Sequence, residues 1–325
     1  MACFHFFSAN GQYKKYTYYA DKMGSPLKLI IGTKSGHLDS VQSTQLAQET
    51  LLFIDSLNHI LSDYDSTSEL SLINQQAGNG FQPISPLLEE ILLIAQNAYY
   101  QTKGAYNIAI GPLSLLWRNA RHEKVFPSKA QIIEAQKLIA LDQIIIDSIQ
   151  HRIFIPNQSM RLDLGSLGKG FVAQKALDYI KNKGVEYAMI DAGGKIVTLA
   201  PDNYYWQIGI NQLREKNKTM PKSIRLANQA VSTSGDAFQF YIYNGHRYSH
   251  IINPLSGYGI EIPKNVTVIA KNGVTADWLS TACSLLSVKA AMQLVTKYDA
   301  AIFIAIQEGK SIQYFKSKGF DGYLN

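Results

Sequence analysis

The sequence contains few of the residues that mark disulfide-rich, cysteine-ligated or membrane-spanning proteins. Only two cysteines, Cys3 and Cys283, occur in 325 residues, so neither a disulfide framework nor a cysteine-based metal site is expected. No apolar run approaches the length of a transmembrane helix. The net charge is +6, but the basic residues are scattered, so a nucleic-acid partner is not expected. These absences indicate an ordinary globular protein whose positive charge suits a small phosphorylated ligand.

The N-terminus is ambiguous. The first twelve residues, MACFHFFSANGQ, have no basic segment before their apolar run, so an intact export signal is not visible. The run CFHFF fits the remnant of a clipped signal, with Cys3 as a lipid-attachment cysteine, and it fits an ordinary disordered terminus equally well. We expect residues 1–20 to be a flexible terminus or signal remnant, followed over residues 21–325 by one domain or two closely packed subdomains.

Hydrophobic periodicity predicts a mixed fold. The predicted helices cover residues 41–61, 86–103, 128–138, 167–181 and 276–296, with a capping box at Ser128 and Gln131. The predicted strands cover residues 26–33, 143–155, 186–191, 195–200, 204–210, 237–243, 265–271 and 299–306. Asn244-Gly245 and Glu308-Gly309 are predicted hairpin turns, and residues 211–222 are predicted to form a mobile loop. Long helices interspersed with hairpins indicate an α+β fold, not a doubly wound parallel sheet.

One segment, VTVIAKNGVTADWLSTACSLLS, places Asp277 and Thr281 four residues apart on a predicted amphipathic helix, so their oxygens lie on the same side. Carboxylate and hydroxyl oxygens in this arrangement suit a hard metal ion. The apolar residues of the segment recur on the other side, which would leave the polar side free for chemistry. The structural alternative makes Thr275 an N-cap and Asp277 a first-turn carboxylate favoured by the helix dipole.

A second segment, LDLGSLGKGFVAQKAL, runs from a strand end through three glycines and Lys169 into a helix. Gly165, Gly168 and Gly170 let the backbone approach a ligand closely, and free amides at the start of a helix favour phosphate. The segment is not a P-loop, because Gly170 stands where Ser or Thr would follow the lysine, and its glycine order is not that of GxGxxG. The structural alternative is a tightly packed turn between a strand and a helix.

Three further segments place glycine, hydroxyl or imidazole groups next to a strand. AMIDAGGKIV has Gly193-Gly194 directly after one, AVSTSGDAFQFY gathers hydroxyls before one, and RYSHIINPLSGYG has His250 ahead of a rigid polar turn. His250 carries a group that exchanges a proton near neutral pH. A hairpin turn or a structural histidine would explain each of them equally simply.

Taken in order, these segments resemble the FAD:protein FMN transferase family, the ApbE-like flavin transferases. The similar segments are KMGSPLKLII, LSDYDSTSELSLIN, GAYNIAIGPLSLLW, LDLGSLGKG, the Gly193-Gly194 pair, STSGD, HIINPLSG and TADWLSTA. Each is weak alone, but their shared order makes chance similarity improbable, and the resemblance covers Met23 to about Gly322. It implies a T-fold-like α+β architecture in which helices flank antiparallel sheets and an FAD cleft lies between the halves.

The resemblance also implies the chemistry. The family moves the FMN half of FAD onto a Ser or Thr hydroxyl of a partner flavoprotein, releases AMP and requires Mg²⁺. By this comparison Asp277, Thr281 and Ser166, the last through its carbonyl, would bind the metal. Asp277 and His250 would be catalytic, with His250 as the base that helps to deprotonate the acceptor hydroxyl. The residues that would contact FAD are Met23, Tyr64, Ala105, Tyr106, Asn107, Asp163, Lys169, Gly193, Gly194, Ser234, Gly235, His250 and Ile251.

Other activities fit the same segments. Tyr64 and Tyr106 are candidates to flank a ring of the nucleotide, whereas Asn107 and Leu255 depart from the Asp and Arg common in the family. Hydrolysis of FAD to FMN and AMP would use the same site, and binding of FAD without turnover would need neither metal ligands nor a base. The expected partners are FAD and an acceptor redox flavoprotein. An exported protein, periplasmic or attached to the inner membrane through its acceptor or a lipid anchor, is expected.

Overall fold

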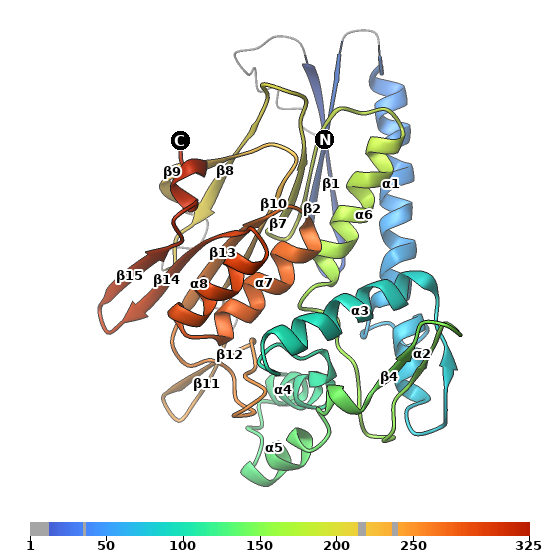
Figure 1. Cartoon of the computed structure of the whole chain (residues 1–325), viewed down its shortest axis with the longest axis vertical. Helices are drawn as coiled ribbons and strands as arrows, with labels where there is room; N and C mark the ends of the chain where they lie inside the picture. The colour runs from blue at the N-terminus through green and yellow to red at the C-terminus, as the bar shows by residue number, and fades with distance from the viewer. Residues whose placement is uncertain (1–12, 35–36, 214–218, 236–239) are drawn as a thin grey trace.

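The computed structural model describes residues 13–34, 37–213, 219–235 and 240–325, and its centre is an eight-stranded sheet (Figure 1). The strand order is β1-β2-β6-β7-β10-β13-β14-β15, and every neighbouring pair is antiparallel. The strands are β1 (Tyr13–Lys22), β2 (Ser25–Lys34), β6 (Tyr187–Ala192), β7 (Lys195–Leu199), β10 (Ala230–Gly235), β13 (Lys264–Ala270), β14 (Ala301–Glu308) and β15 (Ser311–Lys316). The predicted α+β class is therefore confirmed.

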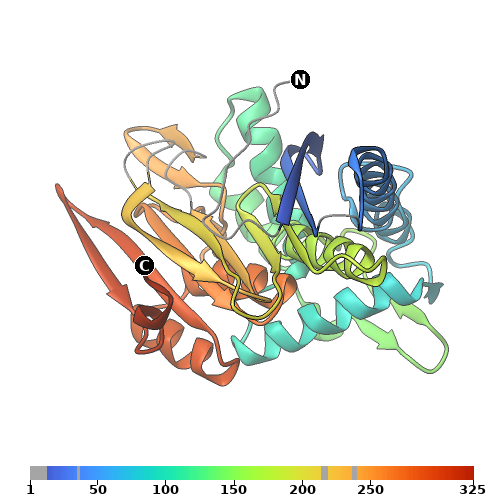
Figure 2. The same ribbon diagram turned by 90° about the horizontal axis from the view of Figure 1, so that it is seen from above.

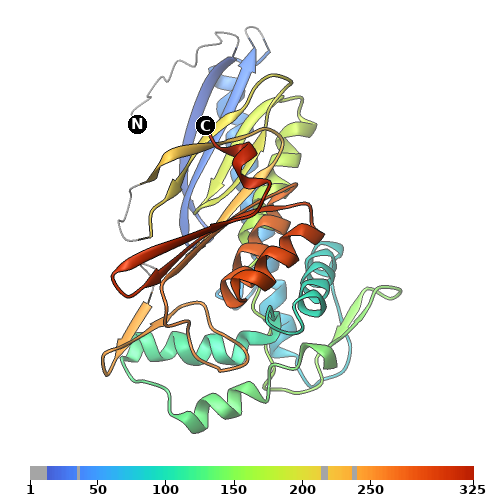
Figure 3. The same cartoon turned by 60° about the vertical axis from the view of Figure 1, so that its left-hand side comes forward.

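Helices cover one face of this sheet, and a β-hairpin covers the other (Figures 2 and 3). The covering helices are α1 (Ser40–Leu61), α6 (Gly168–Asn182), α7 (Gly273–Leu285) and α8 (Val288–Lys297). The opposite face carries β8 (Trp206–Asn211), β9 (Thr219–Leu226) and the 3-10 helix η3 (Phe320–Tyr323). Because both faces are covered, β13 is buried along its whole length, and its apolar residues follow one another without strict alternation.

The remaining elements lie below the sheet in Figure 1. They are α2 (Glu69–Gln75), α3 (Pro86–Gln101), α4 (Gly111–Glu123), α5 (Lys129–Gln136), η1 (Ile108–Ile110), η2 (Leu141–Gln143), β3 (Gln82–Pro83), β4 (Ile145–Asp147), β5 (Arg152–Phe154), β11 (Phe240–Tyr243) and β12 (His246–Ser249). One cluster of buried apolar side chains joins α1, α3, α6 and α7 to the large sheet. α3 therefore shares a core with the sheet, whereas α4 and α5 contribute to a separate cluster of buried apolar side chains.

Local patterns predict several elements correctly. The capping box of Ser128 and Gln131 is present at the start of α5. Asn244-Gly245 forms the turn between β11 and β12, and both residues have positive φ, as a two-residue hairpin turn requires. The other predicted turn lies one residue later, at residues 309–310, because Glu308 still pairs with Ser311.

Two predicted elements are wrong because each joins two segments. The helix predicted over residues 276–296 is interrupted by Ser287, whose hydroxyl accepts a hydrogen bond from the Ala290 N–H and starts α8. The strand predicted over residues 143–155 is η2 followed by the β4–β5 hairpin. In both places a local capping or turn signal ends an element that the apolar pattern alone would continue.

Further corrections concern helix and strand boundaries. Thr275 is not the N-cap of α7, because the helix begins at Gly273 and Asn272 accepts the capping hydrogen bond from the Thr275 N–H. Residues 219–222, predicted as part of a loop, begin β9, while residues 214–218 lie outside the described residues. Both boundaries were misplaced because the end of a strand or helix has only a weak sequence signal.

At the N-terminus, residues 13–20, predicted to be flexible, belong to β1 and pair with β2. Residues 1–12, with the signal-remnant interpretation and Cys3, lie outside the described part, as do residues 237–239 of the strand predicted over 237–243. Among the helices that the structure describes, none combines the length and apolarity needed to cross a bilayer.

Candidate active site

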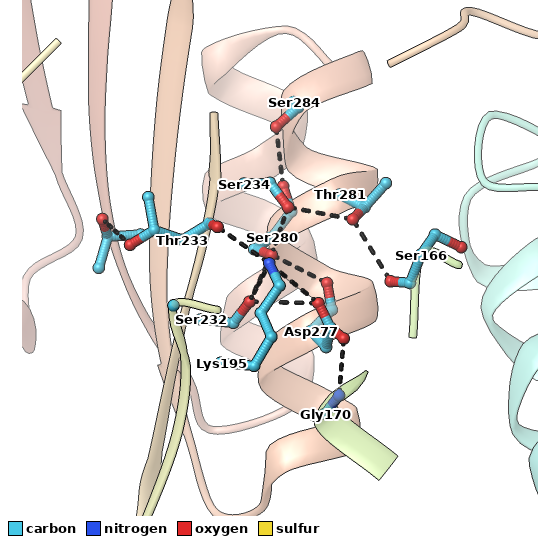
Figure 4. Close-up of polar contacts among 12 residues, drawn as sticks. Ser166, Gly170, Lys195, Ser232, Thr233, Ser234, Asp277, Ser280, Thr281 and Ser284 are labelled. Atoms are coloured by element: carbon cyan, nitrogen blue, oxygen red, sulfur yellow. Dashed lines mark hydrogen bonds and ion pairs between the residues drawn. The ribbon is translucent and has the colours of Figure 1, made fainter. Parts of the chain in front are cut away.

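The polar side of α7 faces inward, toward β10 and the start of α6 (Figure 4). Asp277 is only 1% exposed, and the hydroxyl-bearing Ser280 and Ser284 are also buried. The prediction of one packed side and one open side is therefore wrong for this helix. Its carboxylate and hydroxyls form a buried polar network.

Asp277 lies at the centre of this network. Its Oδ2 accepts a 2.8 Å hydrogen bond from the backbone N–H of Gly170. Its Oδ1 lies 3.1 Å from the Nζ of Lys195 and accepts a 3.3 Å hydrogen bond from the hydroxyl of Ser232. A second hydroxyl, that of Ser280, lies 3.0 Å from the Ser232 hydroxyl. The buried carboxylate therefore has both the hydrogen bonds and the counter-charge that burial demands.

Glycines permit the close contacts around this carboxylate. A Cβ on Gly170 would lie 2.3 Å from the Gly273 carbonyl oxygen and 2.5 Å from the Cβ of Asp277. At the end of β10, a Cβ on Gly235 would lie 2.1 Å from the Oδ1 of Asn265. Gly170 is required because backbone occupies the space of a side chain, whereas at Gly235 the Asn265 side chain would have to move; the φ angles of both glycines are ordinary.

One turn further along α7, three predicted site residues meet. The hydroxyl of Thr281 donates to the backbone oxygen of Ser166 over 3.4 Å and lies 3.1 Å from the hydroxyl of Ser234. Thr281 and Ser166 are 115 positions apart in the sequence. The fold therefore brings the carbonyl of Ser166 to the helix that carries Asp277 and Thr281, as the metal-site prediction requires.

Two tight glycine turns lie at the same end of the sheet. Met23-Gly24 joins β1 to β2 and Gly193-Gly194 joins β6 to β7, and all four residues have positive φ. The Gly193 N–H donates to the Pro26 carbonyl over 3.1 Å, which ties the second turn to β2. The Gly194 N–H donates to Asp191 Oδ1 over 2.7 Å, but burial outweighs this hydrogen bond and raises the pKa of the carboxyl.

The glycine-rich segment is held in place from the side of α2. The side-chain oxygen of Asn74 accepts a 2.8 Å hydrogen bond from the Leu162 N–H, and its amide donates a 3.0 Å hydrogen bond to the Leu162 carbonyl. Asp163 then turns the chain by accepting a 2.8 Å hydrogen bond from the Gly165 N–H. Asn74 ends the segment LSDYDSTSELSLIN, so two of the sequence segments noted above contact each other directly.

Two of the first three amides of α6 are already paired. Its N-cap, Leu167, provides no capping side chain, but the Gly168 N–H donates to the Leu164 carbonyl over 2.8 Å and the Gly170 N–H donates to Asp277 Oδ2, which leaves the Lys169 N–H for a ligand. Lys169 lies in this turn, and its pKa is lowered, first by burial and then by repulsion from Lys195, with Asp277 acting in the opposite direction. The turn therefore offers an anion the Lys169 N–H and the Lys169 ammonium.

Arg118, on α4, supports an exposed aromatic ring. Its guanidinium carbon lies 3.8 Å from the ring centroid of Tyr64, which is 76% exposed. The guanidinium also binds Asp63 over 2.8 Å and lies 3.7 Å from Asp163. Burial opposes the charge of Arg118, but the hydrogen bond and charge of Asp63 outweigh it and raise the pKa. The exposed ring of Tyr64 is thus held on one face by the guanidinium of Arg118.

The sequence model of the ApbE family matches residues 23–304. The chain belongs to the ApbE family. The family predicted from the sequence segments is therefore confirmed, and the match includes every residue placed above in the Asp277 network and the two glycine turns.

Relatives and solved structures agree with this membership. The chain is 30% identical over 267 residues to an FAD:protein FMN transferase of Klebsiella pneumoniae, covering 82% of this chain and 81% of the relative. It is 24% identical over 294 residues to the enzyme of that name from Escherichia coli K12, covering 88% and 84%. The apo structure of the flavinyl transferase ApbE from Pseudomonas stutzeri superimposes with a TM-score of 0.83 at 26% identity, covering 96% and 97%. The flavin transferase ApbE from Vibrio cholerae, at 22% identity, gives the same TM-score over 96% of this chain and 99% of that one, which shows the shared fold.

Within this ApbE-family fold, part of the predicted nucleotide site turns out to be supporting structure. The ring of Tyr106 is 1% exposed and its hydroxyl accepts a 2.8 Å hydrogen bond from the Ser166 hydroxyl, so the prediction that it flanks a nucleotide ring is wrong. Asn107 is also buried, and its side chain accepts a hydrogen bond from the Ala109 N–H and caps η1. Ala105, next to them, is half-buried.

His250 follows β12 and is half-buried, and Ile251 beside it is buried. The polar turn after them is anchored to the lower helices, because the indole N–H of Trp117 donates a 2.8 Å hydrogen bond to the Gly257 carbonyl. This anchoring fixes the segment that carries the histidine. The catalytic roles of His250 and Asp277 and the binding of a metal by Ser166, Asp277 and Thr281 stay predictions. So do the FAD contacts of Met23, Tyr64, Ala105, Asn107, Asp163, Lys169, Gly193, Gly194, Ser234, Gly235, His250 and Ile251.

Four residues of the site were not predicted from the sequence: Lys195, Ser232, Ser280 and Arg118. Lys195 directly follows Gly193-Gly194, and Ser280 lies three positions after Asp277, so helical and strand spacing could have suggested both. Arg118 has no such local signal. Its contacts come from two separate segments, Asp63-Tyr64 and Asp163.

Proposed function

We propose that this chain transfers the FMN half of FAD to a Ser or Thr hydroxyl of an acceptor flavoprotein, with release of AMP and with Mg²⁺ bound at Asp277. The observation that carries the proposal is that Thr281 contacts the Ser166 carbonyl one helical turn from Asp277, whose carboxylate contacts Gly170 at the start of α6. Relatives named FAD:protein FMN transferase support the reaction.

The donor atoms fit Mg²⁺. Carboxylate, hydroxyl and carbonyl oxygens are its preferred ligands, and octahedral ligands at about 2.1 Å from the ion lie roughly 3 Å from one another. Thr281 Oγ1 and the Ser166 oxygen are 3.4 Å apart, which needs only a small adjustment. Among the described residues no group of three or more His, Cys, Asp or Glu side chains could hold a metal, so this site would depend on one carboxylate. When bound, Mg²⁺ would neutralise the charge that develops on the diphosphate.

The rest of the nucleotide has suitable partners nearby. The backbone N–H of Lys169, in the first turn of α6, and the ammonium of the same residue would bind phosphate oxygens. The exposed ring of Tyr64, backed by Arg118, offers a face on which a planar ring can stack. Arg118 lies 3.7 Å from Asp163, so the ring of Tyr64 is supported close to the glycine-rich segment that carries Ser166.

The transfer step balances with the groups present. The acceptor hydroxyl oxygen forms a bond to the phosphorus on the FMN side, and the bond between this phosphorus and the bridging oxygen breaks. The electron pair of that bond leaves with AMP, and the hydroxyl proton passes to a base. We assign this base to His250, because an uncharged imidazole accepts a proton at neutral pH.

Incubation with FAD, Mg²⁺ and a flavoprotein domain carrying an acceptor threonine tests the proposal. We expect flavin fluorescence on the denatured acceptor band and one AMP for each flavin attached. AMP and FMN without a labelled acceptor would show hydrolysis instead. Bound FAD with neither product would show a binding protein and overturn the proposal.

A further inference from the structure

Lys195 occupies a complete cation site on Asp277. It is the first residue of β7, and its side chain is 13% exposed. Its Nζ donates to the Ser232 hydroxyl over 2.9 Å and to the Thr233 carbonyl over 2.9 Å, and lies 3.1 Å from Asp277 Oδ1 (Figure 4). An ammonium has three N–H donors, so these three oxygens satisfy all of them.

The same oxygen atoms leave little room for a second cation. A carboxylate offers about four acceptor positions. Gly170, Ser232 and Lys195 already use three of those on Asp277. A divalent ion bound to this carboxylate would also lie within a few ångströms of a buried unit positive charge, with little water between them to screen the repulsion.

We infer that Lys195 is an internal counter-ion that competes with the metal for Asp277. In the metal-free protein the ammonium neutralises the buried carboxylate and fixes its position. Binding of a divalent cation moves the ammonium off Oδ1, which lowers the affinity for the metal. The freed ammonium stays beside the Gly193-Gly194 turn, where a phosphate oxygen of the substrate can become its new partner. The inference rests on the proposed metal site.

Lys195→Met tests the competition, because methionine keeps the length of the side chain and removes its charge. Mn²⁺ binding is measured by electron paramagnetic resonance on protein stripped with EDTA, without FAD, and melting is followed with and without Mn²⁺. We expect the variant to bind Mn²⁺ roughly tenfold or more tightly than the wild type. The variant should melt at a lower temperature than the wild type in EDTA, because Asp277 loses its counter-charge. Mn²⁺ should raise the melting temperature of the variant more than that of the wild type.

Two further variants complete the design. Lys28→Met removes an equal charge from β2, which is separated from β7 by β6, at a position that pairs with Asp191, and should leave the Mn²⁺ affinity unchanged. Lys195→Gln is the second variant if methionine prevents folding, since it keeps a donor to Ser232. Mn²⁺ affinity equal to or weaker than that of the wild type in the Lys195 variants would overturn the inference while leaving the metal site intact. If neither the wild type nor the variants bind Mn²⁺, the proposed metal site itself is wrong.

Discussion

The backbone N–H of Gly170 donates a 2.8 Å hydrogen bond to Asp277 Oδ2, across 107 positions of the sequence. This contact joins the start of α6, which would bind phosphate, to the helix that carries the predicted metal ligands. It forms because Gly170 and Gly273 let the two helices approach without intervening side chains. The position of the Asp277 carboxylate therefore depends on Gly170, which has no side chain with which to contact a substrate.

Gly170→Ala should destabilise the protein by about 1–3 kcal/mol, because the added methyl group overlaps the Gly273 carbonyl and the Asp277 Cβ. Urea denaturation measures the change. Gly168→Ala is the matched control, since no atom lies within 4 Å of the Cβ it adds. Equal stability of the two variants would show that the close approach of α6 and α7 is not needed.

Arg118→Met should weaken FAD binding by about 2- to 30-fold, the range expected for loss of one cation–π contact beneath Tyr64. Quenching of flavin fluorescence measures the affinity. Arg152→Met removes a similar pair, 4.2 Å from the Phe81 ring, and should have no effect on affinity. Because Arg118→Met leaves the carboxylate of Asp63 without its partner, the double variant with Asp63→Asn separates lost stability from lost stacking. Wild-type affinity for FAD in that double variant would show that Arg118 does not support Tyr64 as a stacking surface.

Asp191→Asn should make the protein more stable at neutral pH than the wild type. Burial raises the pKa of Asp191 above its ordinary value of 3.8, so the folded state favours the neutral acid. The ionised form therefore costs stability, and this cost grows as pH rises from the ordinary value through the raised one. We expect the difference in melting temperature between variant and wild type to be largest near pH 8 and to shrink toward pH 4. A variant less stable than the wild type at pH 8 would contradict this sign.

His250→Ala should slow flavin transfer by about 10²- to 10⁴-fold, the usual contribution of a general base, while FAD binding falls much less. Single-turnover labelling of the acceptor measures the rate. His246→Ala is the control, because His246 begins β12 four residues before His250, is exposed, and lies 3.8 Å from the Glu261 carboxylate. A wild-type rate in His250→Ala would move the role of base to another residue.

Sequence patterns predicted the parts of this structure that depend on local periodicity. The spacing of Asp277 and Thr281 holds because both lie on one helix, and the positive φ of Gly193-Gly194 matches the turn that its position after a strand predicted. The break at Ser287 was missed because a capping serine is a weaker signal than an apolar stripe that continues on both sides of it.

The contacts that complete the site could not be predicted in this way. Lys195 reaches Asp277 only because β7 and β10 pair beneath α7, and the periodicity of either segment says nothing about that pairing. The burial of Tyr106 follows from its packing against Ser166 and Trp278, which are distant in sequence. Such long-range contacts depend on the whole fold.

The role of Asp277 in flavin transfer is tested most directly by the mass of an acceptor domain after incubation with FAD and Mg²⁺ and either the wild type or Asp277→Ala. We expect the wild type to add one FMN to the acceptor and to release AMP, whereas Asp277→Ala adds none although it still binds FAD. An acceptor modified by Asp277→Ala at the wild-type rate would contradict this role.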